Sequence, residues 1–281
     1  MEIAKTTEPE NSMQWFVFFK DQLLLKKEYT TNGENKYGIP HGINPPVTPE
    51  AGCTIHEVTL TDGHKVKTFA LEQPVPETEE WVMTGLRASY DYLPLANYQA
   101  AGKSFQILYW DEHSRFCPVC GTPMEQQTPI MKKCPECGNE MYPPVSTAII
   151  VLIRKGKEIL LVHARNFRGT FHGLVAGFLE TGETLEQCVE REVMEETGLH
   201  VRNIRYYKSQ PWGIANDILA GFYCEVDGDP TIQMDTSELK YAQWVKRENI
   251  ILQPDDASLT NEMMQKFRDG EIRNINHVNT F

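Results

Sequence analysis

Four of the seven cysteines in this 281-residue chain fall within one window of 21 residues. They form two Cys-Pro-x-Cys-Gly segments, Cys117–Gly121 and Cys134–Gly138, with 13 residues between Cys120 and Cys134. A tight turn can present both thiolates of a pair, and the closing glycine permits the left-handed backbone that such turns need. Four thiolates complete a tetrahedral shell with no open position, so the spacing predicts a structural Zn²⁺ ribbon.

The cysteines outside this window support that interpretation. Cys53, Cys188 and Cys224 have no close partner in sequence, and the first ten residues, MEIAKTTEPE, lack the charged and apolar blocks of a signal peptide. This pattern favours a metal site with buried thiols over a disulfide framework. Two pairs of reduced or redox-active thiols are the alternative.

The longest apolar run, Thr147–Ile153, is far shorter than the roughly 20 residues that span a bilayer. We therefore expect no membrane partner and a cytoplasmic protein. With 39 acidic against 27 basic side chains the net charge is −12, the opposite of a protein that binds by neutralising phosphates. An anionic ligand would thus need a divalent metal, and the zinc ribbon shows no basic stripe for nucleic acid.

The cysteine window divides the chain into expected domains. Residues 1–12 are predicted to be a disordered tail, 13–114 an N-terminal domain, 115–142 the zinc ribbon and 143–281 a C-terminal domain. The N-terminal domain reads as β-rich, because short apolar stretches alternate with turn-rich segments. Apolar spacing predicts a helix over Leu95–His113, in which Gly102 is out of place.

The C-terminal domain reads as strands flanked by helices, which indicates an α/β layered fold. Strands are expected near Thr147–Ile153, Glu158–His163, Gly173–Ala176, Ile204–Ser209, Ile218–Glu225 and Tyr241–Val245, and helices near Thr184–Thr197 and Ser258–Phe267.

The expected helix near Thr184–Thr197 carries an unusual group of carboxylates. Glu192, Glu195 and Glu196 lie at positions i, i+3 and i+4, so they project from one face and repel one another unless cations neutralise them. Oxygen-only ligands select hard ions, hence Mg²⁺ or Mn²⁺. A solvated acidic helix face is the alternative for the three glutamates alone.

The wider segment from Gly177 to Leu199 matches the pattern G-x5-E-x7-R-E-U-x-E-E-x-G-U, with U aliphatic, at every fixed position. It resembles the Nudix box, whose family hydrolyses nucleoside diphosphates linked to another moiety. The resemblance implies metal binding by Glu192 and Glu196, a ligand or base role for Glu195, and a metal contact from the Ala176 carbonyl.

The resemblance also implies that Arg191 and Glu183 pair to hold the loop against the helix. A Nudix domain after a four-Cys ribbon and a β-rich domain is similar to the NADH pyrophosphatase subfamily, although the N-terminal third matches only in position and size. That likeness implies a multidomain α+β and α/β protein: an N-terminal β-rich domain, a zinc ribbon and a Nudix α/β/α sandwich. Members are typically homodimers.

A second signature of that subfamily, S-Q-P-W-P-F-P-x-S, is only half present, at Ser209–Asp217. The first four residues match, which implies substrate contacts from Gln210, Pro211 and Trp212. Gly213–Ala215 replaces P-F-P and Asp217 replaces the final serine. The departure bears on NADH preference and leaves the pyrophosphate chemistry intact.

Three further residues carry over by resemblance. Tyr142 is similar to a substrate-contacting tyrosine, with a linker aromatic as the alternative. Phe178, like Trp212, could stack on a base, with core packing as the alternative. Glu238, six residues before Trp244, is similar to a late glutamate that completes the metal shell, and a lone surface glutamate is the alternative.

The resemblance implies an enzyme that cleaves the diphosphate of NAD(H) into nicotinamide mononucleotide and AMP, and that also removes NAD caps from RNA. Glu192, Glu195 and Glu196 are the expected catalytic residues, Mg²⁺ or Mn²⁺ the catalytic cofactor and Zn²⁺ the structural one. The alternatives are hydrolysis of ADP-ribose or dinucleoside polyphosphates, and a non-catalytic Nudix module that senses a nucleotide.

Overall fold

The computed structural model describes residues 12–29, 35–167, 169–254 and 256–272. The chain divides into two compact units, Met1–Pro144 with Gly213–Asn216, and Val145–Trp212 with Asp217–Phe281. Of the expected disordered tail, residues 1–11 lie outside the described residues. In the part of the chain that is described, no helix is both long and apolar enough to cross a membrane.

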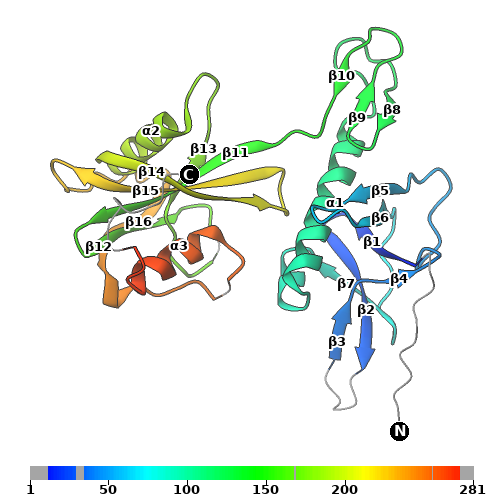
Figure 1. Ribbon diagram of the computed structural model, residues 1–281, viewed down its shortest axis with the longest axis horizontal. Helices are drawn as coiled ribbons and strands as arrows, with labels where there is room; N and C mark the ends of the chain where they lie inside the picture. Colours follow the sequence, from blue (N-terminus) through cyan, green and yellow to red (C-terminus); the bar gives the residue numbers. More distant parts are fainter. Residues whose placement is uncertain (1–11, 30–34, 168, 255, 273–281) are drawn as a thin grey trace. The chain divides into compact units, whose positions relative to one another are not determined.

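The first unit contains a seven-stranded sheet with the order β3-β2-β1-β6-β5, in which β4 pairs with β1 and β7 with β2 (Figure 1). Strands β1 and β6 run parallel, and the other pairs are antiparallel. The strands are β1 (Met13–Phe19), β2 (Gln22–Tyr29), β3 (Asn35–Gly38), β4 (His41–Gly42), β5 (His56–Thr59), β6 (Lys65–Ala70) and β7 (Trp81–Gly85).

Strand β1 is buried on both of its faces. Phe16 and Phe18 belong to the cluster that includes residues of helix α1 (Leu95–His113), whereas Trp15 and Val17 belong to a second cluster. The unbroken apolar run in this strand follows from burial on both sides. A short 3₁₀ helix, η1 (Ala88–Asp91), precedes α1. The sheet confirms the predicted β-rich N-terminal domain.

Helix α1 spans the range predicted from the sequence, and the structure explains its glycine. A Cβ on Gly102 would lie 2.7 Å from the Cα of Gly213, which belongs to the same unit. Next to this contact, the Gln106 side-chain amide donates to the Ala215 carbonyl at 2.6 Å. A residue that costs about 1 kcal/mol in an exposed helix is thus required here by close backbone approach.

The ribbon, which contains β8 (Glu125–Thr128), β9 (Met131–Lys133) and β10 (Glu140–Met141), is fixed to α1 by a buried lysine. The Lys132 ammonium lies 2.6 Å from the Asp111 carboxylate and 5.3 Å from the centre of the Trp110 ring. His56 approaches the other Asp111 oxygen at 3.2 Å. Burial alone would raise the pKa of Asp111, but the close contacts with His56 and Lys132 outweigh it and lower the pKa to about 2.

The second unit is built on a six-stranded mixed sheet with the order β14-β15-β11-β12-β16, in which β13 pairs with β11. Strands β11 and β15 are parallel, and the remaining pairs are antiparallel. The strands are β11 (Ser146–Lys155), β12 (Glu158–Ala164), β13 (Val175–Phe178), β14 (His200–Trp212), β15 (Asp217–Asp227) and β16 (Leu239–Lys246).

Helices α2 (Leu185–Thr197) and α3 (Leu259–Arg268) cover opposite faces of this sheet (Figure 1). Strand β11 shows why, since Ile149 and Val151 pack in the cluster with α2 while Ile150 and Leu152 pack in the cluster with α3. A second 3₁₀ helix, η2 (Arg247–Asn249), lies between β16 and α3. The arrangement confirms the predicted α/β/α sandwich.

Candidate functional site

The four window cysteines come together as the spacing predicted. Their sulfur atoms all lie within 4.8 Å of one another, with separations of 3.4 Å for Cys120–Cys134 and 3.5 Å for Cys117–Cys137. A tetrahedral shell with Zn–S bonds of about 2.3 Å has edges of about 3.8 Å, so the quartet fits zinc. The glycines that close the two turns, at positions 121 and 138, both have φ of +76°, the left-handed conformation expected from the sequence.

The carboxylates are presented by α2, whose start is fixed by a capping box. Thr184 accepts from the Gln187 backbone, and Gln187 accepts in return from the Thr184 backbone. Gly198 closes the helix in the left-handed conformation with φ of +68°. Because Val189 and Val193 are buried against the sheet, the neighbouring stripe of the helix presents Glu192, Glu195 and Glu196 together.

Glu196 is the most unusual of these carboxylates. It is 6% exposed, and its Oε2 atom is buried without a hydrogen-bond partner among the described residues. Burial, together with the nearby charges of Glu192, Glu238 and Asp235, raises the pKa of Glu196 to about 8. A buried carboxyl beside three further carboxylates is unfavourable on its own, and a bound divalent cation would relieve both the burial and the repulsion.

Arg191 gathers the other carboxylates of the motif. Its guanidinium forms two bonds to Glu183, at 2.5 and 3.1 Å, and one to the Phe178 carbonyl at 3.0 Å. The expected pair is therefore present, and it lowers the pKa of Glu183 to about 2. Arg191 also contacts Glu192 and Glu195, each at 2.9 Å. The sequence pattern did not predict these two contacts. These contacts hold two candidate ligands in place.

Strand β13 lies directly against the carboxylate of Glu192. A Cβ on Gly177 would lie 1.9 Å from the Glu192 carboxyl carbon, so the glycine leaves room for the carboxylate in the position that it occupies. Ala176, the neighbouring residue in β13, is exposed and pairs with Ile150 of β11. The first glycine of the motif is therefore a cradle for a candidate ligand.

The late glutamate lies in the turn that precedes β16. In addition to burial, the negative charge of Glu238 raises the pKa of both Glu192 and Glu196. Asp235, which sequence reasoning missed, contributes to the charge at Glu196 as well. No motif pointed to it, because it reaches the helix only through the fold, where its backbone N–H donates to the Glu196 carbonyl at 2.9 Å.

The predicted substrate contacts are distributed over both units. Phe178 is 56% exposed beside the carboxylate helix, and Trp212 is partly exposed at the end of β14, next to exposed Pro211. Tyr142, in the first unit, is 54% exposed and donates to Glu140 at 3.1 Å. All five assignments, including Gln210, stay predictions.

Gln210 has structural contacts of its own. Its amide donates to the Ala257 carbonyl at 2.9 Å and accepts from the Leu259 backbone at 2.7 Å. These bonds join β14 to the start of α3. In the partly changed signature, Asp217 is half-buried and burial raises its pKa.

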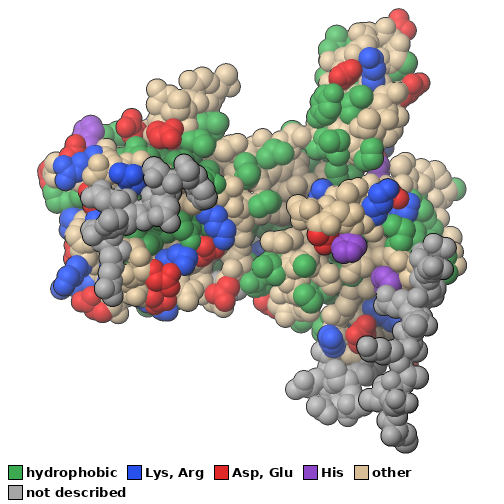
Figure 2. All heavy atoms as spheres, viewed as in Figure 1, with side chains coloured by type: hydrophobic (Ala, Val, Ile, Leu, Met, Phe, Trp, Pro, Cys, Tyr) green, Lys and Arg blue, Asp and Glu red, His purple; other side chains and the backbone are tan. Residues whose placement is uncertain are grey.

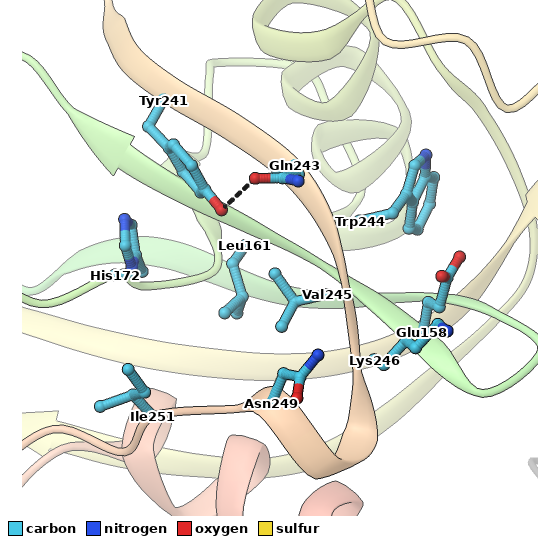
Figure 3. Close-up of a pocket in the computed structure, with 10 residues that line it drawn as sticks. All are labelled: Glu158, Leu161, His172, Tyr241, Gln243, Trp244, Val245, Lys246, Asn249 and Ile251. Carbon is cyan, nitrogen blue, oxygen red and sulfur yellow. Dashed lines mark hydrogen bonds between the residues drawn. The ribbon is translucent and has the colours of Figure 1, made fainter.

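A separate cleft of about 400 Å³ opens beside β12 and β16 (Figure 3). Leu161 and Val245 belong to the α3 side of the sheet, and the Tyr241 hydroxyl donates to Gln243 at 2.7 Å. The His172 and Tyr241 rings lie 4.2 Å apart and are tilted by 35°, and burial, with the nearby charge of His163, lowers the pKa of His172. The lining residues include none of the α2 carboxylates, so the cleft is distinct from the carboxylate site.

Three features define the class of this protein: a mixed sheet between two helices, a group of carboxylates on helix α2, and a ribbon with four thiolates. Together they are typical of a Nudix-type hydrolase with a zinc ribbon. Three family models match in the same order. They are the NADH pyrophosphatase-like rudimentary NUDIX domain over residues 12–110, the NADH pyrophosphatase zinc ribbon domain over 112–142 and the NUDIX domain over 143–267.

Relatives match over most of the chain. The NAD-capped RNA hydrolase NudC of Chromobacterium violaceum is 32% identical over 248 residues, 86% of this chain and 87% of the relative. The protein of the same name from Pseudomonas aeruginosa is 34% identical, over 75% of this chain and 76% of the relative. A solved NUDIX hydrolase from Nitrosomonas europaea has a TM-score of 0.49 at 19% identity, covering 57% of this chain and 93% of that chain. The chain belongs to the Nudix hydrolase family.

Proposed function

We propose that this chain hydrolyses the diphosphate bond of NAD(H), giving nicotinamide mononucleotide and AMP. The observation that carries the proposal is the buried Glu196 carboxylate, whose Oε2 atom has no hydrogen-bond partner in the described part of the chain, beside Glu192, Asp235 and Glu238. Its surroundings suit a divalent cation, which would supply positive charge for an anionic substrate. The names of the relatives, NAD-capped RNA hydrolase, support an NAD moiety as that substrate.

We further propose that Glu192, Glu195, Glu196 and Glu238, with the Ala176 carbonyl, hold Mg²⁺ or Mn²⁺. Such an ion, when bound, neutralises phosphate oxygens and lowers the pKa of a water molecule. Arg191 keeps Glu192 and Glu195 within reach of the site, and exposed Phe178 offers a ring for a base to stack on.

NAD-capped RNA is the second candidate substrate, favoured by the names of the relatives. On the face drawn in Figure 2, acidic and basic side chains lie interspersed, in keeping with the net charge of −12. Such a surface favours recognition of the cap with few contacts to the RNA body, because extended RNA contacts rely on positive charge.

The remaining assignments complete the proposal. The three domains are residues 13–114, 115–142 and 143–281, and the protein acts in the cytoplasm as a homodimer. The substrate contacts come from Tyr142, Phe178, Gln210, Pro211 and Trp212.

A competition assay tests which substrate is preferred, with NADH, NAD⁺, NAD-capped RNA, ADP-ribose and diadenosine polyphosphates offered side by side with Mn²⁺ or Mg²⁺. We expect NAD(H) or NAD-capped RNA to be cleaved well ahead of the others. Preferential cleavage of ADP-ribose would contradict NAD(H) as the substrate. No turnover of any compound would favour a non-catalytic module that senses a nucleotide.

The Gly177→Ala substitution tests the cradle under Glu192. The new methyl group must displace the Glu192 carboxylate, because the two would lie 1.9 Å apart. We expect NADH turnover to fall about 100-fold, the cost of misplacing a catalytic group by about 1 Å, with little change in folding, since only the end of a flexible side chain moves. Gly85→Ala is the control, because nothing lies within 4 Å of a Cβ there. Equal turnover by the two variants would show that the cradle has no role.

A further inference from the structure

The turn that carries Glu238 has little regular structure of its own. It covers residues 235–238, immediately before β16. Asp235 folds it locally, since its side chain accepts from both the backbone N–H and the hydroxyl of Ser237 at 2.7 Å. The Leu239 backbone donates to the Asp235 carbonyl at 2.9 Å. These bonds shape the turn, but they do not fix it relative to the carboxylate helix.

Helix α2 fixes the first side of the turn. The Gln233 backbone donates to the Thr197 carbonyl at 2.8 Å, and the Asp235 backbone donates to the Glu196 carbonyl at 2.9 Å. The start of the turn is therefore tied to the residue whose side chain is the buried candidate ligand. Glu238 lies three residues after Asp235 in the chain. These two bonds therefore do not fix its position, which depends on contacts at the C-terminal end of the turn.

Arg165, at the end of β12, fixes that other end. Its backbone N–H donates to the Glu238 carbonyl at 2.6 Å, and its Nε and Nη2 atoms both donate to the Thr236 carbonyl, at 3.0 and 2.7 Å. A register shift between His163 and Ala164 interrupts the β12–β16 pairing immediately before it. Such bulges redirect the chain next to active sites.

These contacts distinguish Arg165 from an arginine that supports the core. Its side chain is exposed, and in the described part of the chain its guanidinium donates to one backbone carbonyl of the turn, that of Thr236, rather than to carboxylates. Removing the guanidinium therefore removes both bonds to the Thr236 carbonyl, keeps the backbone bond to the Glu238 carbonyl, and leaves the sheet and its two apolar clusters intact. We propose that Arg165 is a positioning residue that holds Glu238 against Glu196 for metal binding, an inference that rests on the proposed function.

The test uses Arg165→Met, which keeps the backbone N–H and removes the guanidinium. Mn²⁺ binding to the full chain is measured by electron paramagnetic resonance, and NADH turnover is measured over a range of Mn²⁺ concentrations. We expect the half-saturating Mn²⁺ concentration to rise about 10-fold, the typical loss when a group that orients a ligand is removed. Excess Mn²⁺ should restore kcat, with KM for NADH and the melting temperature unchanged. Arg165→Lys should recover part of the affinity.

A double-mutant cycle with Glu238→Gln decides whether the two residues act together. If Arg165 acts through Glu238, the double variant binds Mn²⁺ no more weakly than Glu238→Gln alone. Arg205→Met, an exposed arginine of the same unit, is the control and should match the unsubstituted protein. Additive losses, or unchanged binding by Arg165→Met while Glu238→Gln weakens it, would overturn the inference. Unchanged binding by Glu238→Gln would instead overturn the ligand set proposed above.

Discussion

The Glu196→Gln variant is expected to lose NADH turnover by at least about 1,000-fold, equivalent to about 4 kcal/mol of transition-state stabilisation. Glu196 is 6% exposed and is the carboxylate on which the charges of Glu192, Glu238 and Asp235 all act. Glutamine has the same shape but lacks the charge needed to hold a cation. Steady-state rates at saturating Mn²⁺ measure the effect.

Folding should be unaffected by this substitution. The Oε2 atom of Glu196 has no hydrogen-bond partner in the described structure that a glutamine would forfeit, so we expect the free energy of unfolding to change by less than about 1 kcal/mol. Glu190→Gln is the matched control, because Glu190 is exposed on the same helix. Turnover by Glu196→Gln within 10-fold of the control would contradict the site assignment.

The second large effect is expected at the buried lysine of the ribbon. Lys132→Met removes the partner of Asp111, whose pKa of about 2 keeps it ionised at neutral pH. Breaking a buried ion pair costs about 3–5 kcal/mol, and here we expect about 2–3 kcal/mol because His56 still contacts Asp111, which is 27% exposed. This corresponds to about 30- to 150-fold faster hydrogen exchange in the ribbon and the end of α1.

The adjacent lysine offers a control with the same chemistry. Lys133 is 49% exposed and lies 3.4 Å from Glu140, so Lys133→Met should change exchange less than about fivefold. Both variants are compared at pH 7 with zinc bound, by mass spectrometry of peptides from residues 108–114 and 131–134. Similar exchange in the two variants would mean that Lys132 does not anchor the ribbon.

Local patterns predicted much of the fold. Helix α2 follows from its capping residues and its terminal glycine, and the paired cysteine turns follow from residues that are close in sequence. The glycine of α1 shows where such reasoning stops. Gly102 weakens the helical pattern, and its cause, the approach of Gly213, lies more than 100 residues away in sequence.

The same limit applies to the candidate site. The motif predicted the pairing of Arg191 with Glu183, which is present. It could not predict Asp235 or Arg165, because they reach the carboxylates through a turn and a strand end that only the folded sheet brings together. Nor could it show that the nitrogen and the oxygen of the Gln210 side-chain amide both bind backbone groups near the start of α3.

The most direct test of the proposed activity is identification of the products formed from NADH with Mn²⁺. Chromatography with mass detection should show AMP and reduced nicotinamide mononucleotide in equal amounts, because the proposed chemistry breaks the diphosphate bond and no other. Free nicotinamide with an ADP-ribose product would place the cleavage at a different bond. That result, or intact NADH with every divalent metal tried, would contradict the proposed activity.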